Sequence, residues 1–521
     1  MDQPGSRTFS RRNLLALGAM AGVAACSSPA TAARSAATST APASTAPAST
    51  GSATTASPAS LATDGALDLA GLKKALTGPL VLPGDSHYVT AAMPYNAALG
   101  VRKPAAIAQV ASRADVRTCV QRVGGRGVPL AARSGGHSYA GYSTPNGGVV
   151  VDVSALRSIT VNADGTAVVG AGARLIDVYA TLAAHGRALP AGSCPTVGVA
   201  GSTLGGGLGV VSRAYGLTCD HVKSATVVTA DGTIVTVDAN HDADLFWALR
   251  GGGGGNGAIV TDFTFTTLPA PTVTIFSLHF PAASTANVLR AWSAWVAAAP
   301  DRLSALCGVT AGATPTNRVT GTWTGASAGL AAQLSALITE VGAAPTSRTT
   351  YTYSYLNAMK SFAGCLNATV SACHSSSTPG GTLPRDSFRA ASRMLGHTVT
   401  TETATAVVNL MSRQRGMVLL FDSLGGQVGR VKVTDTAFAH RAAQASVQIY
   451  AGSAASGPAV ARVQQALAPI VGTGAYVNYL NPAQTDWATA YYGANLPRLR
   501  TVIKHYDPDG IFTFAQSVLR A

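Results

Sequence analysis

The sequence predicts an α+β fold, and three observations support this prediction. From about residue 102 onward, short apolar runs typical of strands alternate with segments whose apolar residues recur at helical spacing. Hydrophobic residues make up 47% of the 521 residues, enough for the cores of roughly two to four domains. The 56 glycines fall in short clusters without a period, which indicates tight loops against a ligand rather than a linker.

The charge pattern excludes one class of partner. Only 12% of residues are charged, and the net charge of +14 arises from 37 Lys and Arg against 23 Asp and Glu, without dense basic tracts. Nucleic-acid binding requires clustered basic residues, so we expect no nucleic-acid partner. No CxxC or HExxH spacing occurs, and we therefore predict no metal site.

Residues 1–26 are predicted to be an export signal. SRRNLL at residues 10–15 resembles a twin-arginine signal, and an apolar run too short to span a bilayer follows it. VAAC at residues 23–26 resembles a lipoprotein cleavage box, in which Cys26 carries the lipid. We expect an extracytoplasmic protein anchored at the cell surface through Cys26; ordinary cleavage of a basic and apolar N-terminus is the alternative.

Residues 27–60 are almost wholly Ser, Thr, Ala and Pro, a composition that predicts a disordered tether. No later stretch is long and apolar enough for a membrane-spanning helix, so the membrane contact is expected only through the lipid. In an oxidising compartment the local pair Cys365 and Cys373 has the spacing of a short disulfide loop, the alternative being two free buried thiols.

Several elements of the first half can be predicted from pattern. Helical spacing runs through residues 104–123, a strand covering 128–136 ends in glycines, and 147–156 is a buried strand. A loop of glycine and serine at a strand end can place backbone N–H groups against a phosphate-bearing ligand, with Arg133 as a nearby cation. No GK[ST] follows any glycine cluster, which excludes a P-loop. Residues 252–257 fit GxGxxG but follow a helix and precede a strand, the reverse of a nicotinamide-binding turn.

Four motifs in order resemble the berberine bridge enzyme-like family of FAD-linked oxidases. They are ARSGGHSYAGYS (132–143), GSCPTVGVAG (192–201), WALRGGGGGNGAIVTDF (247–263) and YYGANLPRLRTVIKHYDPDGIFTFAQSV (491–518). The resemblance covers residues 99–520. It implies a two-part FAD-binding domain of the vanillyl-alcohol-oxidase type (PCMH-type) at 61–270, a substrate domain with an antiparallel sheet covered by helices at 271–475, and a C-terminal segment at 476–521 that returns to the FAD domain.

The resemblance also implies how FAD is held. His137 corresponds to the residue that bonds the flavin 8α-methyl group and Cys194 to the one that bonds C6, so bicovalent FAD is expected. Two departures, Ser202 for the usual His and Asn256-Gly257-Ala258 for Asn-Phe-Gly, loosen the packing beside the cofactor without removing these residues. The other residues expected at FAD are Arg133, Ser134, Gly135, Gly136, Ser138, Pro195, Thr196, Val197, Gly198, Gly201, Gly205, Gly206, Gly209, Ile259, Val260, Asn495, Phe514 and Gln516.

The catalytic residues are predicted from the second half. Removing hydride from an alcohol requires a base for the hydroxyl proton. If AYVNY (475–479) is a strand, Tyr476 and Asn478 share one face and Tyr479 takes the other, and the resemblance selects Tyr476 as the base. Asp422 in LLFDSLGGQ resembles the carboxylate that supports this tyrosine, so the proton would pass from substrate to Tyr476 to Asp422. A core tyrosine and an aspartate capping a turn are the alternatives.

Further elements follow from the same patterns. Helices are expected at 286–299 and 329–341, and strands at 417–424, 428–433 and 446–450. In the tail, a helix capped by Asn495 should stop before Asp507-Pro508, and IFTFAQSV (511–518) should be a final strand.

The function predicted from these features is an FAD-dependent oxidase of a hydroxyl-bearing carbohydrate or a glycosylated or phenolic metabolite. Val197 occupies the position where side-chain size controls access of O₂ in the family, and valine permits it, so O₂ is the expected acceptor and H₂O₂ the product. The alternatives are a flavin dehydrogenase with another acceptor and a non-catalytic ligand-binding lipoprotein. The expected partners are the small-molecule substrate and O₂.

Overall fold

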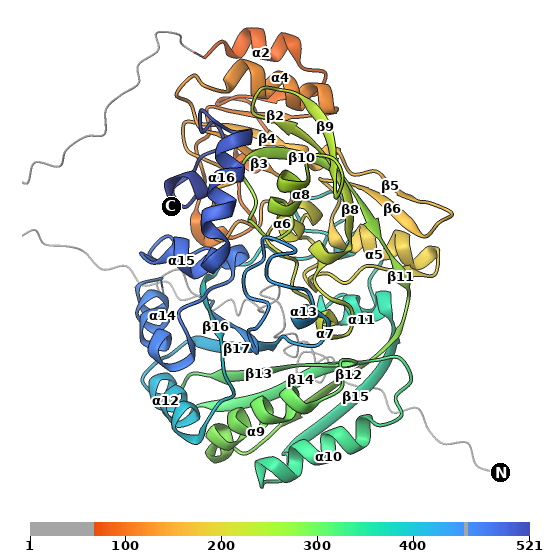
Figure 1. Ribbon diagram of the computed structural model, residues 1–521, viewed down its shortest axis with the longest axis vertical. Helices are drawn as coiled ribbons and strands as arrows, with labels where there is room; N and C mark the ends of the chain where they lie inside the picture. The colour runs from red at the N-terminus through yellow and green to blue at the C-terminus, as the bar shows by residue number, and fades with distance from the viewer. Residues whose placement is uncertain (1–66, 453–456) are drawn as a thin grey trace, which may run out of the picture.

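The computed structural model describes residues 67–452 and 457–521. The signal and tether predicted for residues 1–60 lie outside these ranges. Two smaller sheets and the C-terminal helices form one half of the molecule, and a large sheet covered by helices forms the other (Figure 1). The predicted α+β class is confirmed.

The first sheet contains four strands in the order β1-β2-β4-β3. Strands β2 and β3 pair in parallel with β4, and helix α4 (Arg113–Val123) buries Val116, Val120 and Val123 against them. The helical spacing predicted through residues 104–123 is wrong for its first part, because Ala106–Gln109 is a strand whose short apolar run is buried. The strands are β1 (Leu80–Val81), β2 (Ala106–Gln109), β3 (Leu130–Arg133) and β4 (Val149–Asp152).

The second sheet is antiparallel, with the order β5-β6-β10-β8-β9. It shares one hydrophobic core with the first sheet, in which Val151 of β4 and Phe263 of β10 are both fully buried. The predicted helix before the Gly252 cluster and the strand after it are present as α8 and β10. The bounds are β5 (Ile159–Val161), β6 (Thr166–Gly170), β8 (Val222–Thr229), β9 (Ile234–Asp238), β10 (Ala258–Thr266), α5 (Leu175–Ala184) and α8 (Ala243–Ala248).

The third sheet contains seven strands, all in antiparallel pairs, in the order β15-β12-β14-β13-β17-β18-β16. Four helices cover one face, where Trp292 of α9 packs on Phe421 of β17, and the other face is turned toward the first two sheets (Figure 1). The strands are β12 (Thr272–His279), β13 (Leu303–Thr310), β14 (Thr316–Thr324), β15 (Ser347–Ser354), β16 (Arg389–Leu395), β17 (Met417–Ser423) and β18 (Ala445–Ala451). The helices are α9 (Thr285–Ala298), α10 (Leu330–Val341), α12 (Thr401–Ser412) and α14 (Gly457–Val471).

Three predicted strands are absent. Residues 428–433 contain the short helix α13 (Gln427–Arg430), residues 477–479 form a 3₁₀ turn, and residues 511–518 pair with no strand of the described chain. Helix α16 (Leu496–Tyr506) begins after Asn495 and ends before Asp507, as predicted. The remaining elements are α2 (Leu69–Ala75), α3 (Tyr88–Ala92), α6 (Val199–Leu204), α7 (Ser212–Tyr215), α11 (Tyr355–Phe362), α15 (Trp487–Tyr492), β7 (Arg187–Ala188) and β11 (Leu268–Pro269).

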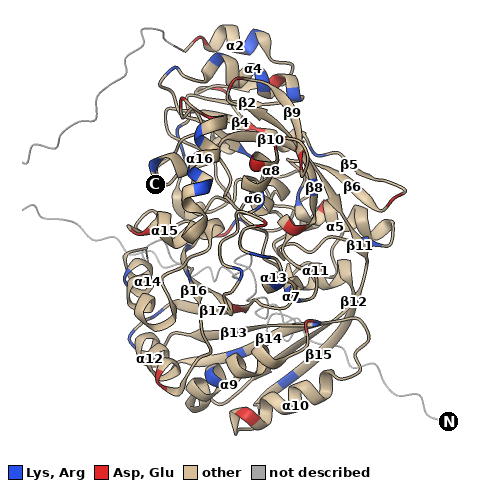
Figure 2. Ribbon diagram, in the orientation of Figure 1, with Lys and Arg blue, Asp and Glu red and all other residues tan. Residues whose placement is uncertain are grey.

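The surface features agree with the charge pattern of the sequence. Basic and acidic residues are scattered over the elements of both halves of the molecule (Figure 2). The structure contains the predicted disulfide between Cys365 and Cys373. None of the helices in the described ranges is long and apolar enough to cross a membrane.

Candidate active site

Two glycine-containing loops touch at the centre of the molecule. Residues 134–138 follow β3, and residues 194–198 precede α6. A Cβ atom on Gly135 would lie 2.3 Å from the backbone nitrogen of Gly198, and a Cβ atom on Gly198 would lie 2.0 Å from Oγ of Ser134. Because neither position leaves room for a side chain, glycine at both is what allows the loops to meet.

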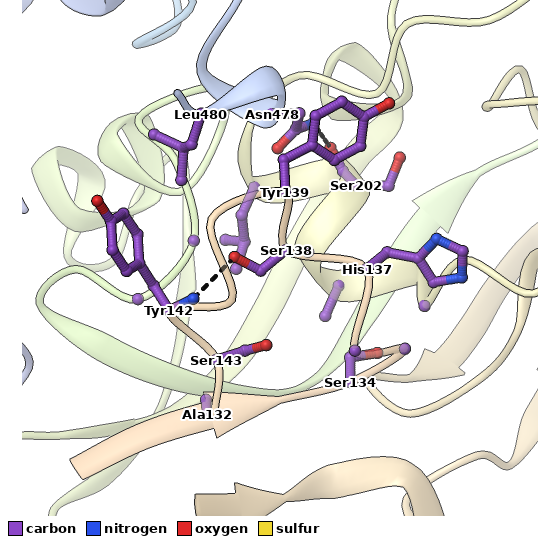
Figure 3. A pocket seen from close by; sticks show the side chains of 18 of the residues that line it. Ala132, Ser134, His137, Ser138, Tyr139, Tyr142, Ser143, Ser202, Asn478 and Leu480 are labelled. Carbon is purple, nitrogen blue, oxygen red and sulfur yellow. Dashed lines mark hydrogen bonds between the residues drawn. The ribbon is translucent and has the colours of Figure 1, made fainter. Parts of the chain in front are cut away.

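A cavity of about 650 Å³ opens beside these loops, within the usual range for small-molecule and cofactor sites. Figure 3 shows His137, Ser138, Tyr139 and Tyr142 projecting from one loop, with Asn478 and Leu480 facing them from the C-terminal part of the chain. The predicted residues that line the cavity are Ser134, Gly135, Gly136, His137, Ser138, Cys194, Val197, Gly198, Gly201, Gly209, Ile259, Val260, Asp422, Tyr476 and Phe514.

Seven predicted cofactor residues do not line this cavity: Arg133, Pro195, Thr196, Gly205, Gly206, Asn495 and Gln516. The Arg133 guanidinium group is 6% exposed and bonds the Asp152 carboxylate at 2.6 Å. Burial opposes ionisation of Asp152, but the charge of Arg133 outweighs it and lowers the pKa of that carboxyl group. The charge of Arg133 therefore stabilises the junction of β3 and β4.

The other departures also have local causes. The side-chain amide of Asn495 donates to the carbonyl oxygens of Val433 and Thr436, so it fixes a loop. The amide of Gln516 donates to the carbonyl of Asn481. Gly205 and Gly206 lie behind the cavity wall, where a Cβ on Gly205 would be 2.1 Å from Oδ1 of Asn478 and one on Gly206 3.0 Å from the ring of Phe438.

His137 is held by two contacts. Its ring stacks on Tyr95 at 3.8 Å between centroids, and its Nε2 lies 3.0 Å from Oγ1 of Thr196. Burial and then the charge of Arg174 lower the pKa of His137 to about 3, although a hydrogen bond to the backbone of Thr196 raises it. The imidazole is therefore neutral near pH 7, which is the nucleophilic form of histidine.

Cys194 lies on the same wall of the cavity. Its side chain is 7% exposed, and its sulfur is 3.8 Å from Oγ1 of Thr196.

Tyr476, the predicted base, lines the cavity and is hydrogen-bonded to the loop at residues 207–208 and to Asn478. Its hydroxyl oxygen accepts hydrogen bonds from the backbone N–H groups of Gly207 at 3.0 Å and Leu208 at 3.2 Å, and from the Asn478 amide at 2.9 Å. Burial raises the pKa of Tyr476 to about 12 in spite of these donors. Because residues 477–479 form a 3₁₀ turn, the strand alternation used to choose between the two tyrosines does not apply.

Tyr479, which a strand at 475–479 would place on the other face, lies beside Tyr476 instead. A 3₁₀ turn has three residues per turn, so Tyr476 and Tyr479 share a side. The Tyr479 ring packs edge-to-face on Tyr476 and stacks on Tyr139, each at 5.0 Å, and it lines the cavity as Asp422 does. Burial, then Tyr139, and then the charge of Asp422 raise the pKa of Tyr479 well above its ordinary value. The glycines at 472 and 474 and Asn481-Pro482 are turn signals that could have indicated this.

Asp422 is an acidic group that lines the same cavity. It lies near the end of β17, between Leu306 of β13 and Ser446 of β18. Burial raises the pKa of Asp422 to about 8, so near neutral pH the carboxyl group can either hold or accept a proton. Other lining residues that the sequence analysis did not select are Ala132, Tyr139, Tyr142, Ser143, Ser202, Phe388, Asn478, Leu480 and Tyr492.

Comparison with known proteins identifies the cofactor. The family described as "FAD binding domain" matches residues 104–238, and "Berberine and berberine like" matches residues 475–519. The chain is 32% identical over 460 residues to the uncharacterized FAD-linked oxidoreductase YgaK of Bacillus subtilis, covering 86% of this chain and 98% of the relative. It is 30% identical to a chitooligosaccharide oxidase of Gibberella zeae, covering 80% and 87%.

A solved structure adds detail on attachment. Glucooligosaccharide oxidase from Acremonium strictum, described with 6-S-cysteinyl, 8α-N1-histidyl FAD, matches with a TM-score of 0.76 and 26% identity over 85% of this chain and 97% of that one. The cavity fits FAD: Gly201 lines it, and a Cβ atom there would meet nothing within 4 Å, so the absent side chain leaves open space. His137 and Cys194 line the same space, and the chain belongs to a group of proteins that bind FAD.

Proposed function

The chain belongs to the berberine bridge enzyme-like family of FAD-linked oxidoreductases, and from this premise we propose that it oxidises a hydroxyl group of a carbohydrate and passes the electrons to O₂, giving H₂O₂. The observation that carries the proposal is that Tyr479 and Asp422 both line the cavity that contains His137. A base and a proton acceptor beside a hydride acceptor are the groups that oxidation of an alcohol requires.

Tyr479 is the proposed base. Because the pKa of the Tyr479 phenol is raised, its anion is not stable near neutral pH. Tyr479 can therefore accept the substrate's proton only by transferring its own proton onward at the same time. Asp422 is the proposed recipient. Because burial raises its pKa to about 8, its carboxylate is a stronger proton acceptor than an ordinary aspartate. The Tyr476 hydroxyl accepts hydrogen bonds from Gly207, Leu208 and Asn478. Its proposed role is therefore to position the loop that contains Gly207 and Leu208.

FAD, when bound, accepts the hydride, and we propose that it is attached at both His137 and Cys194. Support comes from their position on one cavity wall and from the cysteinyl and histidyl FAD of the glucooligosaccharide oxidase. The bond to the flavin would form from the thiol group of Cys194.

Val197 supports O₂ as the acceptor. Val197 lines the cavity in the loop that follows Cys194 and precedes helix α6, and its side chain is small. A dehydrogenase that uses a different acceptor is the second candidate, and slow reoxidation of the reduced protein in air would favour it.

The carbohydrate class is supported by relatives named as oligosaccharide oxidases and by Asp422. Tyr139 and Phe388 add aromatic surface beside Tyr479, which suits the apolar faces of sugar rings. Export with a lipid on Cys26 belongs to the same proposal, because oligosaccharides are abundant outside the cell; it rests on residues outside the described ranges.

The test is H₂O₂ release by the purified full chain from gluco-, chito- and xylo-oligosaccharides and from phenolic alcohols. The matched control is each sugar with its reducing end already oxidised to the acid. We expect release from at least one sugar and none from its oxidised form. H₂O₂ release from a phenolic alcohol alone would show that the substrate is a phenolic alcohol and not a carbohydrate. Flavin reduction by a substrate without H₂O₂ release would show that the enzyme is a dehydrogenase.

A further inference from the structure

Thr196 lies outside the large cavity but touches both residues of the proposed attachment. Its Oγ1 is 3.0 Å from Nε2 of His137 and 3.8 Å from the sulfur of Cys194. The side chain is 5% exposed and lines a separate polar cavity of about 220 Å³ behind the imidazole. A buried hydroxyl that contacts both residues can control which atom of His137 is available to the flavin.

The direction of the hydrogen bond can be worked out from its neighbours. A hydrogen bond between the imidazole and the backbone of Thr196 raises the pKa of His137, whereas burial and the charge of Arg174 lower it. A hydrogen bond that favours the protonated ring is one in which the ring donates to a backbone acceptor. A side-chain hydrogen bond with Thr196 lowers the pKa of Tyr95, against burial and the charge of Asp386. The Thr196 hydroxyl oxygen, 3.0 Å from Nε2 of His137, has lone pairs that can accept from Nε2–H.

We propose that Thr196 is a positioning residue for flavin attachment, because it keeps the proton of His137 on Nε2 and so leaves the lone pair of Nδ1 for the 8α carbon. The inference deepens the proposed function and rests on its covalent histidyl link. Histidine N1 corresponds to Nδ1, and N1 is the atom named for the histidyl FAD of the glucooligosaccharide oxidase.

The step balances as follows. Nδ1 of His137 forms a bond to the methyl carbon while that carbon loses a proton, and the electron pair of the broken C–H bond passes into the flavin ring system. The imidazole loses its Nε2 proton. The flavin, reduced by two electrons, takes up two protons and returns to the oxidised state when O₂ accepts both electrons and both protons as H₂O₂.

A hydroxyl group suits this step better than a carbonyl. Before the bond forms, Nε2 carries a proton and needs an acceptor; afterwards, it carries a lone pair and needs a donor. The Thr196 hydroxyl can rotate to serve both states, whereas its backbone carbonyl can only accept. Without the hydroxyl, the alkylated imidazole faces an acceptor alone and keeps its proton more tightly.

The experiment compares Thr196→Val, which has the same shape without the hydroxyl, with Thr196→Ser, which keeps it. The full chain is produced without flavin and mixed with FAD in air, and flavin retained by acid-precipitated protein is followed over time. The linked peptide is then analysed for the bonded nitrogen. We expect attachment to His137 at least ten-fold slower in Thr196→Val, with Nε2-linked or unlinked flavin, and near-normal attachment through Nδ1 in Thr196→Ser.

The outcomes are distinct. If Thr196→Val attaches flavin through Nδ1 at the wild-type rate, the inference is wrong while the proposed function stands. If the wild-type protein retains no covalent flavin at His137, the proposed attachment fails and the inference fails with it. If Thr196→Val does not fold, Thr196→Ala is compared with Thr196→Ser by the same measurement of flavin attachment. If the apolar variants bind FAD and attach it normally, the Thr196 hydroxyl has no role in attachment and the inference is wrong.

Discussion

Replacing Asp422 with asparagine should make the protein less active but more stable at high pH. In the folded protein burial raises the pKa of Asp422 from 3.8 to about 8. Because the folded pKa lies above the unfolded one, the wild-type protein loses stability as the pH rises from about 4 to about 8, and loses no more above that. Asparagine cannot ionise, so Asp422→Asn should not show this loss.

The size of the effect follows from the shift. At 1.36 kcal/mol for each pKa unit, the three units between about pH 5 and about pH 8 correspond to roughly 4 kcal/mol. The cost of burying the asparagine amide is the same at both pH values, so it cancels from the difference. The advantage of Asp422→Asn in free energy of unfolding should therefore grow by roughly this amount between about pH 5 and about pH 9.

The assay is urea unfolding of the FAD-loaded full chain, followed by tryptophan fluorescence at both pH values. Asp435→Asn, at an exposed position, is the matched control and should show no such growth. In the same preparations, flavin reduction by substrate should be slower in Asp422→Asn by about 10²-fold or more, the usual contribution of a positioned proton acceptor. A stability difference that does not change with pH would refute the reasoning about burial, and unchanged flavin reduction would refute the proton transfer.

Further predictions test neighbouring groups. Flavin reduction in the wild-type protein should rise with pH through about 8, since Asp422 accepts a proton only when ionised, and a flat pH profile would contradict this. Tyr479→Phe should slow flavin reduction by about 10²-fold, whereas Tyr476→Phe should mainly lower stability, by about 1–3 kcal/mol, because buried N–H groups lose their acceptor; the opposite pattern in stopped-flow and unfolding data would restore Tyr476 as the base. Val197→Leu should slow reoxidation in air without slowing anaerobic reduction, and equal reoxidation rates would remove the proposed control of O₂ access. Replacing Cys365 and Cys373 together with alanine should cost roughly 2.5 kcal/mol of unfolding free energy, from the loop-closure entropy of the short ring, and an unchanged urea midpoint would show that this bond adds no stability.

Two of the loops that line the cavity can be recognised from the sequence, because their signals are local. The loops around His137 and Cys194 are recognisable because glycines, a histidine and a cysteine stand close together in the chain, and close backbone approach requires glycine there. Asp422 was found for a similar reason, since a carboxylate at the end of an apolar strand is unusual.

The errors arose where the outcome depends on distant partners. Arg133 is neutralised by Asp152, which joins it only when β3 pairs with β4. Residues 511–518 alternate like a strand but have no strand beside them in the described chain. The expectation that Tyr476 and Tyr479 face opposite ways depends on a strand at 475–479, whereas residues 477–479 form a 3₁₀ turn in which the Asn478 amide donates to the distant carbonyl oxygen of Ser202.

The most direct test of the account is the absorbance of the flavin in the purified full chain, mixed without oxygen with an oligosaccharide that releases H₂O₂ in air. The account predicts flavin that stays with the acid-denatured protein, bleaches when the sugar is added, and recovers rapidly when air is admitted. A protein that carries no flavin, or whose flavin is not bleached by any oligosaccharide, would contradict it.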